Sequence, residues 1–356
     1  MTTRELWQSI MHYGEFDRMP VIHWTEWPET HDRWISEGMP PDVNEHEYFD
    51  TVPWHARVGV HLGLHPPFTE EVLEETDEYR VLRDEVGVIK KDWKHRSCIP
   101  QFIDHTLKTA ADWPEFKKRL QPDAARIPDD LDERIRGAED SGLAIAVPGA
   151  SMMGWIRNWM GVPNMSYLMY DDPDCYAEMV DTIADLVCWG VDQLVPRMHS
   201  TPDICHGWED ICGKTGPLVS PAIFEKCVAR GYRKVRDKLD EHGIRLYSID
   251  TDGDVAALLR NWLDAGVNVQ FPVEIGTWNA DPMAYRKKYG RELRIVGGFN
   301  KLALEKGRAA IDAEIERRIP LMKDGGFVIM PDHLITPGVP LDDYKYYLDR
   351  IRTLRL

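Results

Sequence analysis

Acidic and imidazole side chains follow short apolar runs at several places in the second half of this chain. Helix-period stretches separate most of these runs, which is typical of repeated βα units. In such units the functional side chains gather where the parallel strands end. We therefore expect one shared mouth, lined by His23, Glu26, Ser151, Glu209, Asp210, Ser248, Asp250, Asp252, Glu274, Asn300, Asp332 and His333.

The composition of this rim predicts two kinds of chemistry. Carboxylates and an imidazole can bind a divalent metal, because Zn2+ accepts both histidine nitrogen and carboxylate oxygen. Among crowded carboxylates, one carboxyl group can also have a raised pKa, which suits acid–base catalysis. We predict Glu209, Asp250 and His333 as metal ligands or as groups that polarise the substrate. The predicted catalytic residues are Asp210, Asp250 and His333, with Asp210 orienting the substrate or donating a proton.

Other strand ends supply candidates for substrate binding. These candidates are His23, Glu26, Ser151, Met152 and Asn300. Met152 opens an apolar cluster, rich in methionine and tryptophan, over residues 152–160. The cluster forms either a packed lid or a wall for a flat or methylated ligand.

Ordinary structural roles stay open for several of these residues. Asp252 and Asp254 precede a predicted helix, so capping explains at least one of them. Glu274 is alternatively a loop carboxylate exposed to water. His333 is alternatively a loop histidine whose hydrogen bonds are satisfied within the protein. Asp332 would either fix an imidazole tautomer at the mouth or cap a turn.

Alternation along the strands limits which neighbouring residues can share a face. At most one of Cys205 and His206 points inward, and His23 and Trp24 stand in the same relation. Ser248 lies on a predicted strand with the same alternation, so its side chain faces either the mouth or the surrounding helix layer.

The elements that must position this rim predict a barrel. Apolar runs indicate strands that start near residues 143, 204, 244, 267, 293 and 327. Residues 20–24 add a seventh strand, and residues 57–62 are the candidate for an eighth. Such a count with crossover helices predicts a (β/α)8 TIM barrel with an N-terminal extension. A doubly wound sheet is the second choice, because the Gly-rich first turn that often accompanies it is missing.

We expect residues 1–356 to form a single domain, in which residues from about 25 to 140 are an irregular insertion or lid. Within that region, residues 81–93 predict a β-hairpin with its turn near Asp84-Glu85 or Gly87. Predicted helices cover residues 3–13, 113–120, 173–194, 221–242, 255–263, 311–322 and an amphipathic tail over 341–356.

Composition and charge exclude some classes of partner. The chain has 356 residues and a net charge of −17, from 60 acidic against 43 basic residues. Nucleic acid and anionic membrane surfaces require clustered positive charge, so we expect neither as a partner. The six cysteines form no C-x-x-C pair, and the N-terminus lacks a signal-peptide pattern. These features predict a cytoplasmic protein with reduced thiols.

Several motifs, in their order along the chain, resemble the uroporphyrinogen decarboxylase superfamily. They are residues 16–21 (FDRMPV), residues 213–221 (GKTGPLVSP), and residues 325–333 (GGFVIMPDH) followed by 337–340 (PGVP). The resemblance extends over nearly the whole chain and implies a (β/α)8 barrel.

One branch that this resemblance implies is decarboxylation of a porphyrinogen without metal or cofactor. Such enzymes carry an arginine-rich loop after the first strand, whereas residues 25–30 here read TEWPET. An acidic loop should repel a substrate with eight carboxylates. His333 does match the late histidine of the decarboxylases.

The other implied branch comprises methyltransferases that exchange methyl groups with corrinoid proteins. Members that act on thiols bind zinc through a His-x-Cys pair and a later cysteine. The corresponding positions here are Ser248 and Asp250, with His333 near the later one. Because the thiolates are missing, a metal site here would be oxygen-rich and would suit an O- or N-methyl substrate.

The resemblance therefore leads to one main hypothesis and two alternatives. The first is a methyltransferase that moves a methyl group between a small methylated substrate and a corrinoid protein, with Zn2+ or another divalent metal. The second is a carboxy-lyase related to uroporphyrinogen decarboxylase. The third is a barrel that binds a partner without catalysis.

Overall fold

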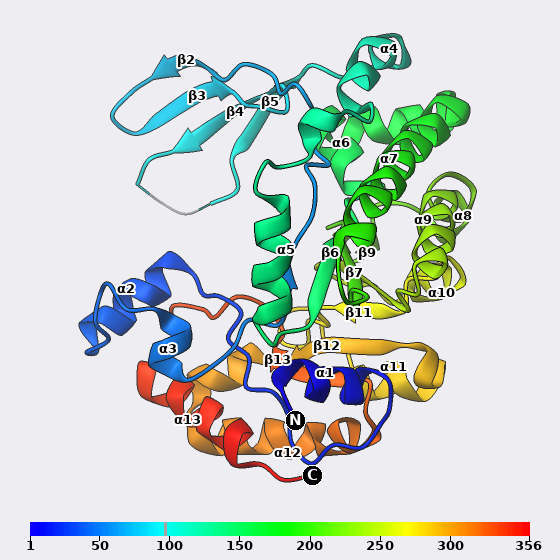
Figure 1. The fold of residues 1–356 in the computed structure, drawn as a ribbon. Helices are drawn as coiled ribbons and strands as arrows, with labels where there is room; N and C mark the ends of the chain where they lie inside the picture. Colours follow the sequence, from blue (N-terminus) through cyan, green and yellow to red (C-terminus); the bar gives the residue numbers. More distant parts are fainter. Residues whose placement is uncertain (96–97) are drawn as a thin grey trace.

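The chain folds around one parallel sheet that is curled on itself (Figure 1). The structure is a computed structural model that describes residues 1–95 and 98–356. Seven strands form the sheet, in the order β1 (Ala56–Arg57), β6 (Ile145–Pro148), β7 (Ile204–Trp208), β10 (Leu246–Asp250), β11 (Val269–Phe271), β12 (Arg294–Phe299) and β13 (Phe327–Pro331).

The apolar runs form strands because both faces of a parallel sheet are covered. All five residues of β13 are buried, and so are all three of β11. The six strands expected from residue 143 onward are confirmed. The predicted TIM-barrel class is confirmed as well, with parallel strands and crossover helices around them.

The two strands expected before residue 143 are much shorter than predicted. Of residues 57–62, only Arg57 pairs in the sheet, together with Ala56. Residues 20–24 make no strand but one isolated bridge, from Ile22 to Val52. A second bridge joins Glu26 to Ile335, beyond the end of β13. The segment 22–26 therefore lies between the two edges of the sheet and takes the eighth position of the barrel.

Helices surround the sheet (Figure 1). Asp172 caps α7 through its side chain and Pro173 occupies its first turn, as the start signal predicts. The helix expected over residues 221–242 is divided at Val228. The helices of this half are α6 (Gly154–Asp171), α7 (Pro173–Leu194), α8 (Pro221–Cys227), α9 (Ala229–Glu241), α10 (Leu259–Asp264), α11 (Pro282–Tyr289), α12 (Arg308–Asp324) and α13 (Leu341–Thr353).

Regular helices and strands occupy much of residues 25–95 and 98–140, where the sequence suggested an irregular insertion or lid. A four-stranded antiparallel sheet occupies its centre and contains the predicted hairpin over residues 81–93. Most side chains of these strands are charged or exposed, so the sequence has no apolar pattern that would predict this sheet. The elements are α2 (Pro28–Ser36), α3 (Glu45–Phe49), β2 (Glu71–Glu75), β3 (Tyr79–Arg83), β4 (Val88–Trp93), β5 (Gln101–His105), α4 (Trp113–Phe116) and α5 (Leu131–Asp140).

The termini lie side by side at the base of the molecule (Figure 1). Helix α1 (Thr3–Met11) packs beside β13, and α13 buries Tyr344, Tyr347 and Ile351, which confirms the predicted amphipathic tail. Within residues 1–95 and 98–356, every helix is too short or too polar to cross a membrane. That residues 1–356 form a single domain stays a prediction.

Candidate functional site at the strand ends

Five acidic or imidazole side chains meet where β7, β10, β11 and β13 end. The carboxylates of Asp210, Asp250 and Asp252 form one group, whose oxygens lie within 4.8 Å of one another. Asp252 also belongs to a second group of the same size with Glu274 and His333. We call these five residues the acidic mouth. Asp252 joins its two halves.

Asp250 is the last residue of β10 and the most perturbed acid of the acidic mouth. Burial raises its pKa well above the usual range, and the nearby charges of Asp210, Asp252 and Glu274 raise it further. Burial and Asp252 also raise the pKa of Asp210. Like charges that share a site disfavour full ionisation, so burial and these neighbours favour the protonated form of Asp250. A neutral acid at this place is able to donate a proton.

The second half of the acidic mouth has the donor set of a metal site. His333 Nε2 lies 3.1 Å from Asp252 Oδ2. Glu274 accepts a hydrogen bond from Gly253 N at 3.0 Å and another from Trp278 Nε1. One imidazole nitrogen and two carboxylates suit a divalent ion such as Zn2+. The sequence predicted His333 here but assigned no metal role to Asp252 or Glu274.

Gly253 permits the loop that connects these groups. Its φ is +89°, and a Cβ added there would lie 2.5 Å from the carbonyl oxygen of Cys212. We expect Gly253→Ala to cost about 2–3 kcal/mol, because strained φ and a backbone clash act together. Gly38→Ala is the matched control, since Gly38 has φ +107° but open space around it. Urea denaturation of both variants measures the difference, and equal losses would contradict the clash.

A cavity of about 360 Å³ opens beside Asp250. Burial lowers the pKa of His206 well below its usual value, and burial also lowers the pKa of His61, so the neutral form of both imidazoles is favoured. Trp54 contacts His206 and stacks on Phe271 at 5.0 Å. The polar and aromatic residues that line the cavity are Arg57, His61, Trp155, His206, Trp208 and Asp250.

Most of these lining residues were missed by the sequence reasoning. The available signal was the period-2 alternation, in which His206, Trp208 and Asp210 share one face. Cys205 lies on the other face and is fully buried. Ser248 lies 2.8 Å from His206 Nδ1 and does not face the helix layer.

Glu209 does not join the acidic mouth, and its role as a metal ligand stays a prediction without a contact that supports it. Its carboxylate is fully buried and binds the start of α6. Ser151 and Met152 belong to the same contact, so the structure gives them structural partners, and their roles in substrate binding stay predictions. The donors to Glu209 are the amides of Met152 (2.7 Å), Met153 (2.9 Å) and Gly154 (2.5 Å) and the hydroxyls of Ser151 (3.0 Å) and Tyr232.

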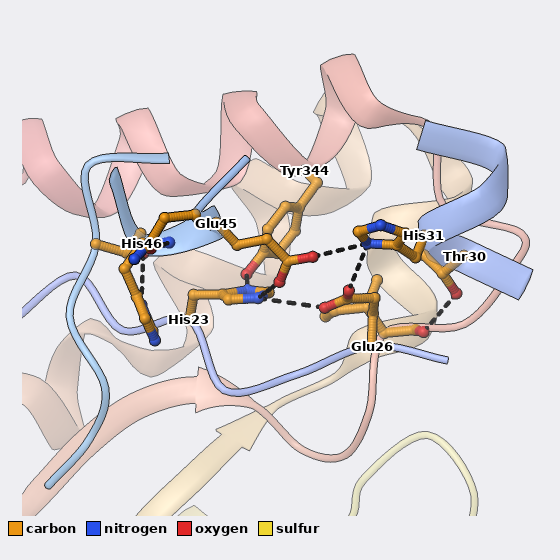
Figure 2. A network of polar contacts seen from close by, with 10 residues as sticks. His23, Glu26, Thr30, His31, Glu45, His46 and Tyr344 are labelled. Atoms are coloured by element: carbon orange, nitrogen blue, oxygen red, sulfur yellow. Dashed lines mark hydrogen bonds and ion pairs between the residues drawn. The ribbon is translucent and has the colours of Figure 1, made fainter. Parts of the chain in front are cut away.

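Three other predicted residues also have structural partners. Asn300 accepts a hydrogen bond from Leu302 N at 3.0 Å and caps a 3-10 helix. His23 and Glu26 contact α2, α3 and α13 instead of the acidic mouth (Figure 2). Trp24, between them, is the residue that faces the barrel interior, 6.0 Å from the His333 ring. Substrate binding by these three residues stays a prediction, and the contacts that the structure gives them are structural.

Asp332 fixes two loops at the mouth. It is fully buried and accepts hydrogen bonds from the amides of Ile275 (2.6 Å), Gly276 (3.1 Å) and Lys301 (2.9 Å). Its carboxylate thus holds the loop after β11 against the loop after β12. Of the two roles expected for Asp332, the structural one is observed.

Comparison with known proteins gives the family. The sequence model described as "Uroporphyrinogen decarboxylase (URO-D)" matches residues 151–354, more than half of the chain. The chain belongs to the uroporphyrinogen decarboxylase family. A solved methyltransferase from Methanosarcina mazei is similar to this family member, with a TM-score of 0.60 and 14% identity over 99% of this chain and 98% of that one. This likeness shows a shared fold.

A second solved structure gives a much weaker match. It is a putative vitamin-B12 independent methionine synthase from Listeria monocytogenes, with 12% identity and a TM-score of 0.26. The match covers 72% of this family member and 96% of that chain.

A thiolate-based zinc site does not fit the residues of this family member. Ser248, which the resemblance places at the first ligand position, is fully buried and bonded to His206 and to the carbonyl oxygen of Cys205. In the part of the chain that the structure describes, no group of metal-capable side chains includes a cysteine. The set Asp252, Glu274 and His333 does fit a divalent cation, but with oxygen and imidazole ligands.

Proposed function

We propose that this chain is a methyltransferase that moves a methyl group between a small O- or N-methyl compound and a corrinoid carried by a separate protein. The observation that supports it most is the position of Asp250, which lines the cavity and also lies in the acidic mouth. The aromatic and imidazole walls of the cavity suit a small, flat ligand. Net charge and composition further support a cytoplasmic enzyme with no nucleic-acid or membrane partner.

Removal of a methyl group from oxygen or nitrogen requires activation of the leaving atom. The C–O or C–N bond breaks, and its electron pair stays on the oxygen or nitrogen of the substrate. We expect Asp250 to deliver a proton to that atom, because burial and neighbouring charges raise its pKa and favour the protonated form. Asp252, Glu274 and His333 would hold a divalent cation, which would supply Lewis-acid activation of an oxygen leaving atom as an alternative to the proton.

A carboxy-lyase is the second candidate, and one observation favours it. Arg57 lines the cavity, where its guanidinium can bind a substrate carboxylate. A porphyrinogen with eight carboxylates is nevertheless a poor partner for the acidic mouth.

A turnover assay separates the candidates. Purified protein is incubated with a corrinoid protein and a panel of methyl ethers and methylamines, while the corrinoid absorption is followed. Methyl transfer would support the proposal. Release of CO2 from a porphyrinogen or a small acid, without methyl transfer, would replace it with the lyase. Corrinoid-protein binding without turnover of any compound would indicate a non-catalytic partner.

The metal at the acidic mouth leads to a prediction about His333. We expect His333→Ala to lower methyl transfer by about 10- to 100-fold at limiting Zn2+ and to regain part of it at excess Zn2+. The reason is that loss of one ligand weakens metal affinity before it changes the chemistry. His199→Ala is the control, since this imidazole is 85% exposed and lies outside the acidic mouth. A loss that excess metal leaves unchanged would contradict the metal role.

A further inference from the structure

A second group of imidazoles and carboxylates lies on the opposite side of the segment 22–26 from the barrel interior (Figure 2). His23 and Glu26 come from that segment, His31 from α2, and Glu45 from the first position of α3. We call these four residues the His23 cluster. None of them belongs to the acidic mouth.

Ligand atoms of His23, Glu26 and Glu45 lie within 4.8 Å of one another, and His31 contacts the same two carboxylates through their other oxygens. His23 Nε2 lies 2.8 Å from Glu45 Oε2 and 3.2 Å from Glu26 Oε2. His31 Nδ1 lies 2.8 Å from Glu45 Oε1 and 3.3 Å from Glu26 Oε1. Each imidazole nitrogen therefore faces the same two carboxylates. Figure 2 shows both carboxylates between the two rings.

One oxygen of this group has no hydrogen bond. Glu26 Oε2 is buried without a hydrogen-bond partner, and the Glu26 side chain is only 7% exposed. A buried carboxylate oxygen without a donor is costly, and a bound cation removes that cost. This oxygen points into the cluster and lies 3.2 Å from His23 Nε2, an ion-pair contact without hydrogen-bond geometry (Figure 2).

A second layer of contacts holds His23 in place. His23 Nδ1 lies 2.7 Å from the hydroxyl of Tyr344 on α13. Tyr344 is fully buried and stacks on Trp34 at 4.9 Å, and Trp34 Nε1 donates to Val339 O at 3.0 Å. Metal-binding histidines usually have the other ring nitrogen fixed in this way. The contact leaves Nε2 directed at the carboxylates.

We propose that the His23 cluster is a structural site for a divalent transition-metal ion such as Zn2+, separate from the acidic mouth. Its ligands are His23 Nε2, His31 Nδ1 and the carboxylates of Glu26 and Glu45. Two nitrogens with two oxygens favour Zn2+, Co2+ or Fe2+ over Mg2+ and Ca2+, which prefer oxygen alone. The ion ties α2 and α3 to the segment that closes the barrel.

Co2+ is the probe, because its visible absorption reports coordination by nitrogen and oxygen. The measurement uses full-length protein with Asp252→Asn and His333→Ala, which removes the donor set of the acidic mouth. After treatment with a chelator, we expect this background to bind one Co2+ per chain and to gain thermal stability. Glu45→Gln in the same background should weaken Co2+ binding by at least about 100-fold and abolish the gain. Glu47→Gln, on the same helix but outside the cluster, is the matched control.

Tyr344→Phe keeps the stacked ring and removes only the hydroxyl bonded to His23. It should weaken Co2+ binding by about 10- to 100-fold, and it remains informative if Glu45→Gln does not fold. A background that binds no Co2+, or a Glu45→Gln variant that binds as well as Glu47→Gln, would overturn the proposal. The readout is metal binding, so failure of methyl transfer would bear on the acidic mouth alone.

Discussion

Asp250→Asn should lower methyl transfer by about 10²- to 10⁴-fold, which is the usual contribution of a general acid. Asparagine has nearly the shape of a protonated aspartic acid but has no proton to give to a leaving atom. Substrate binding should change little, because the amide still fills the same place at the cavity. The expected pattern is a fall in kcat with a nearly constant KM, measured in the assay with a corrinoid protein.

The same substitution should make the fold more stable, by on the order of 1 kcal/mol at neutral pH. Burial raises the pKa of Asp250, so the folded state keeps a proton that the unfolded state releases above its ordinary pKa. Stability of the wild type therefore falls as pH rises from that ordinary pKa toward the raised one. Asparagine does not titrate, so the advantage of the variant should grow over this pH range.

Asp237→Asn on α9 is the control, since this carboxylate is exposed. It should leave both activity and the pH dependence of stability unchanged. Retention of full activity by Asp250→Asn would end its assignment as the proton donor. A pH-independent difference in unfolding free energy would show that Asp250 is ionised in the folded state.

Glu209→Ala should destabilise the fold by about 3–5 kcal/mol, the range found when a buried charged partner is removed. The substitution leaves three backbone amides at the start of α6 and the hydroxyls of Ser151 and Tyr232 without their acceptor. Buried donors that lose their partner carry the full cost of desolvation. The midpoint and slope of urea denaturation give the change in unfolding free energy.

Glu209→Gln provides the comparison, because it keeps one acceptor oxygen and nearly the same shape. It should lose clearly less stability than the alanine variant, and Tyr232→Phe, which removes a single donor, should lose about 1 kcal/mol. A loss below about 1 kcal/mol for Glu209→Ala would mean that water replaces the carboxylate at the start of α6.

The barrel could be predicted from sequence because a parallel sheet covered on both faces leaves continuous apolar runs. The run over residues 327–331 is an example, and every one of its side chains is buried. The antiparallel sheet β2–β5 has no such apolar runs in its sequence, since β2 exposes all five of its residues. Residues 20–24 were expected as a strand, but they form only one isolated bridge, from Ile22 to Val52.

The rule that function gathers at strand ends correctly brought Asp210, Asp250 and His333 into one region. Their chemical roles stay predictions. The rule failed for Glu209 because Glu209 and Asp210 both follow the end of β7 but have different contacts. Asp210 joins the acidic mouth, whereas Glu209 binds the start of α6. His23 and Trp24 likewise contact different parts of the molecule. By contrast, the hydrogen bonds of Asn300 and Asp332 depend on loop contacts that a strand pattern does not encode.

The segment 22–26, at the eighth position of the barrel, has a consequence for local opening of the barrel. Only a few backbone hydrogen bonds join this segment and its neighbours to the two edges of the sheet. Among them are Trp27 N to Ile335 O at 3.1 Å and Val52 N to Val21 O at 3.0 Å. Elements with so few bonds open at lower free energy than the global unfolding of the protein. Amide hydrogen exchange should be fastest there among the barrel segments. Such opening would let solvent approach Trp24 and His333 from the side.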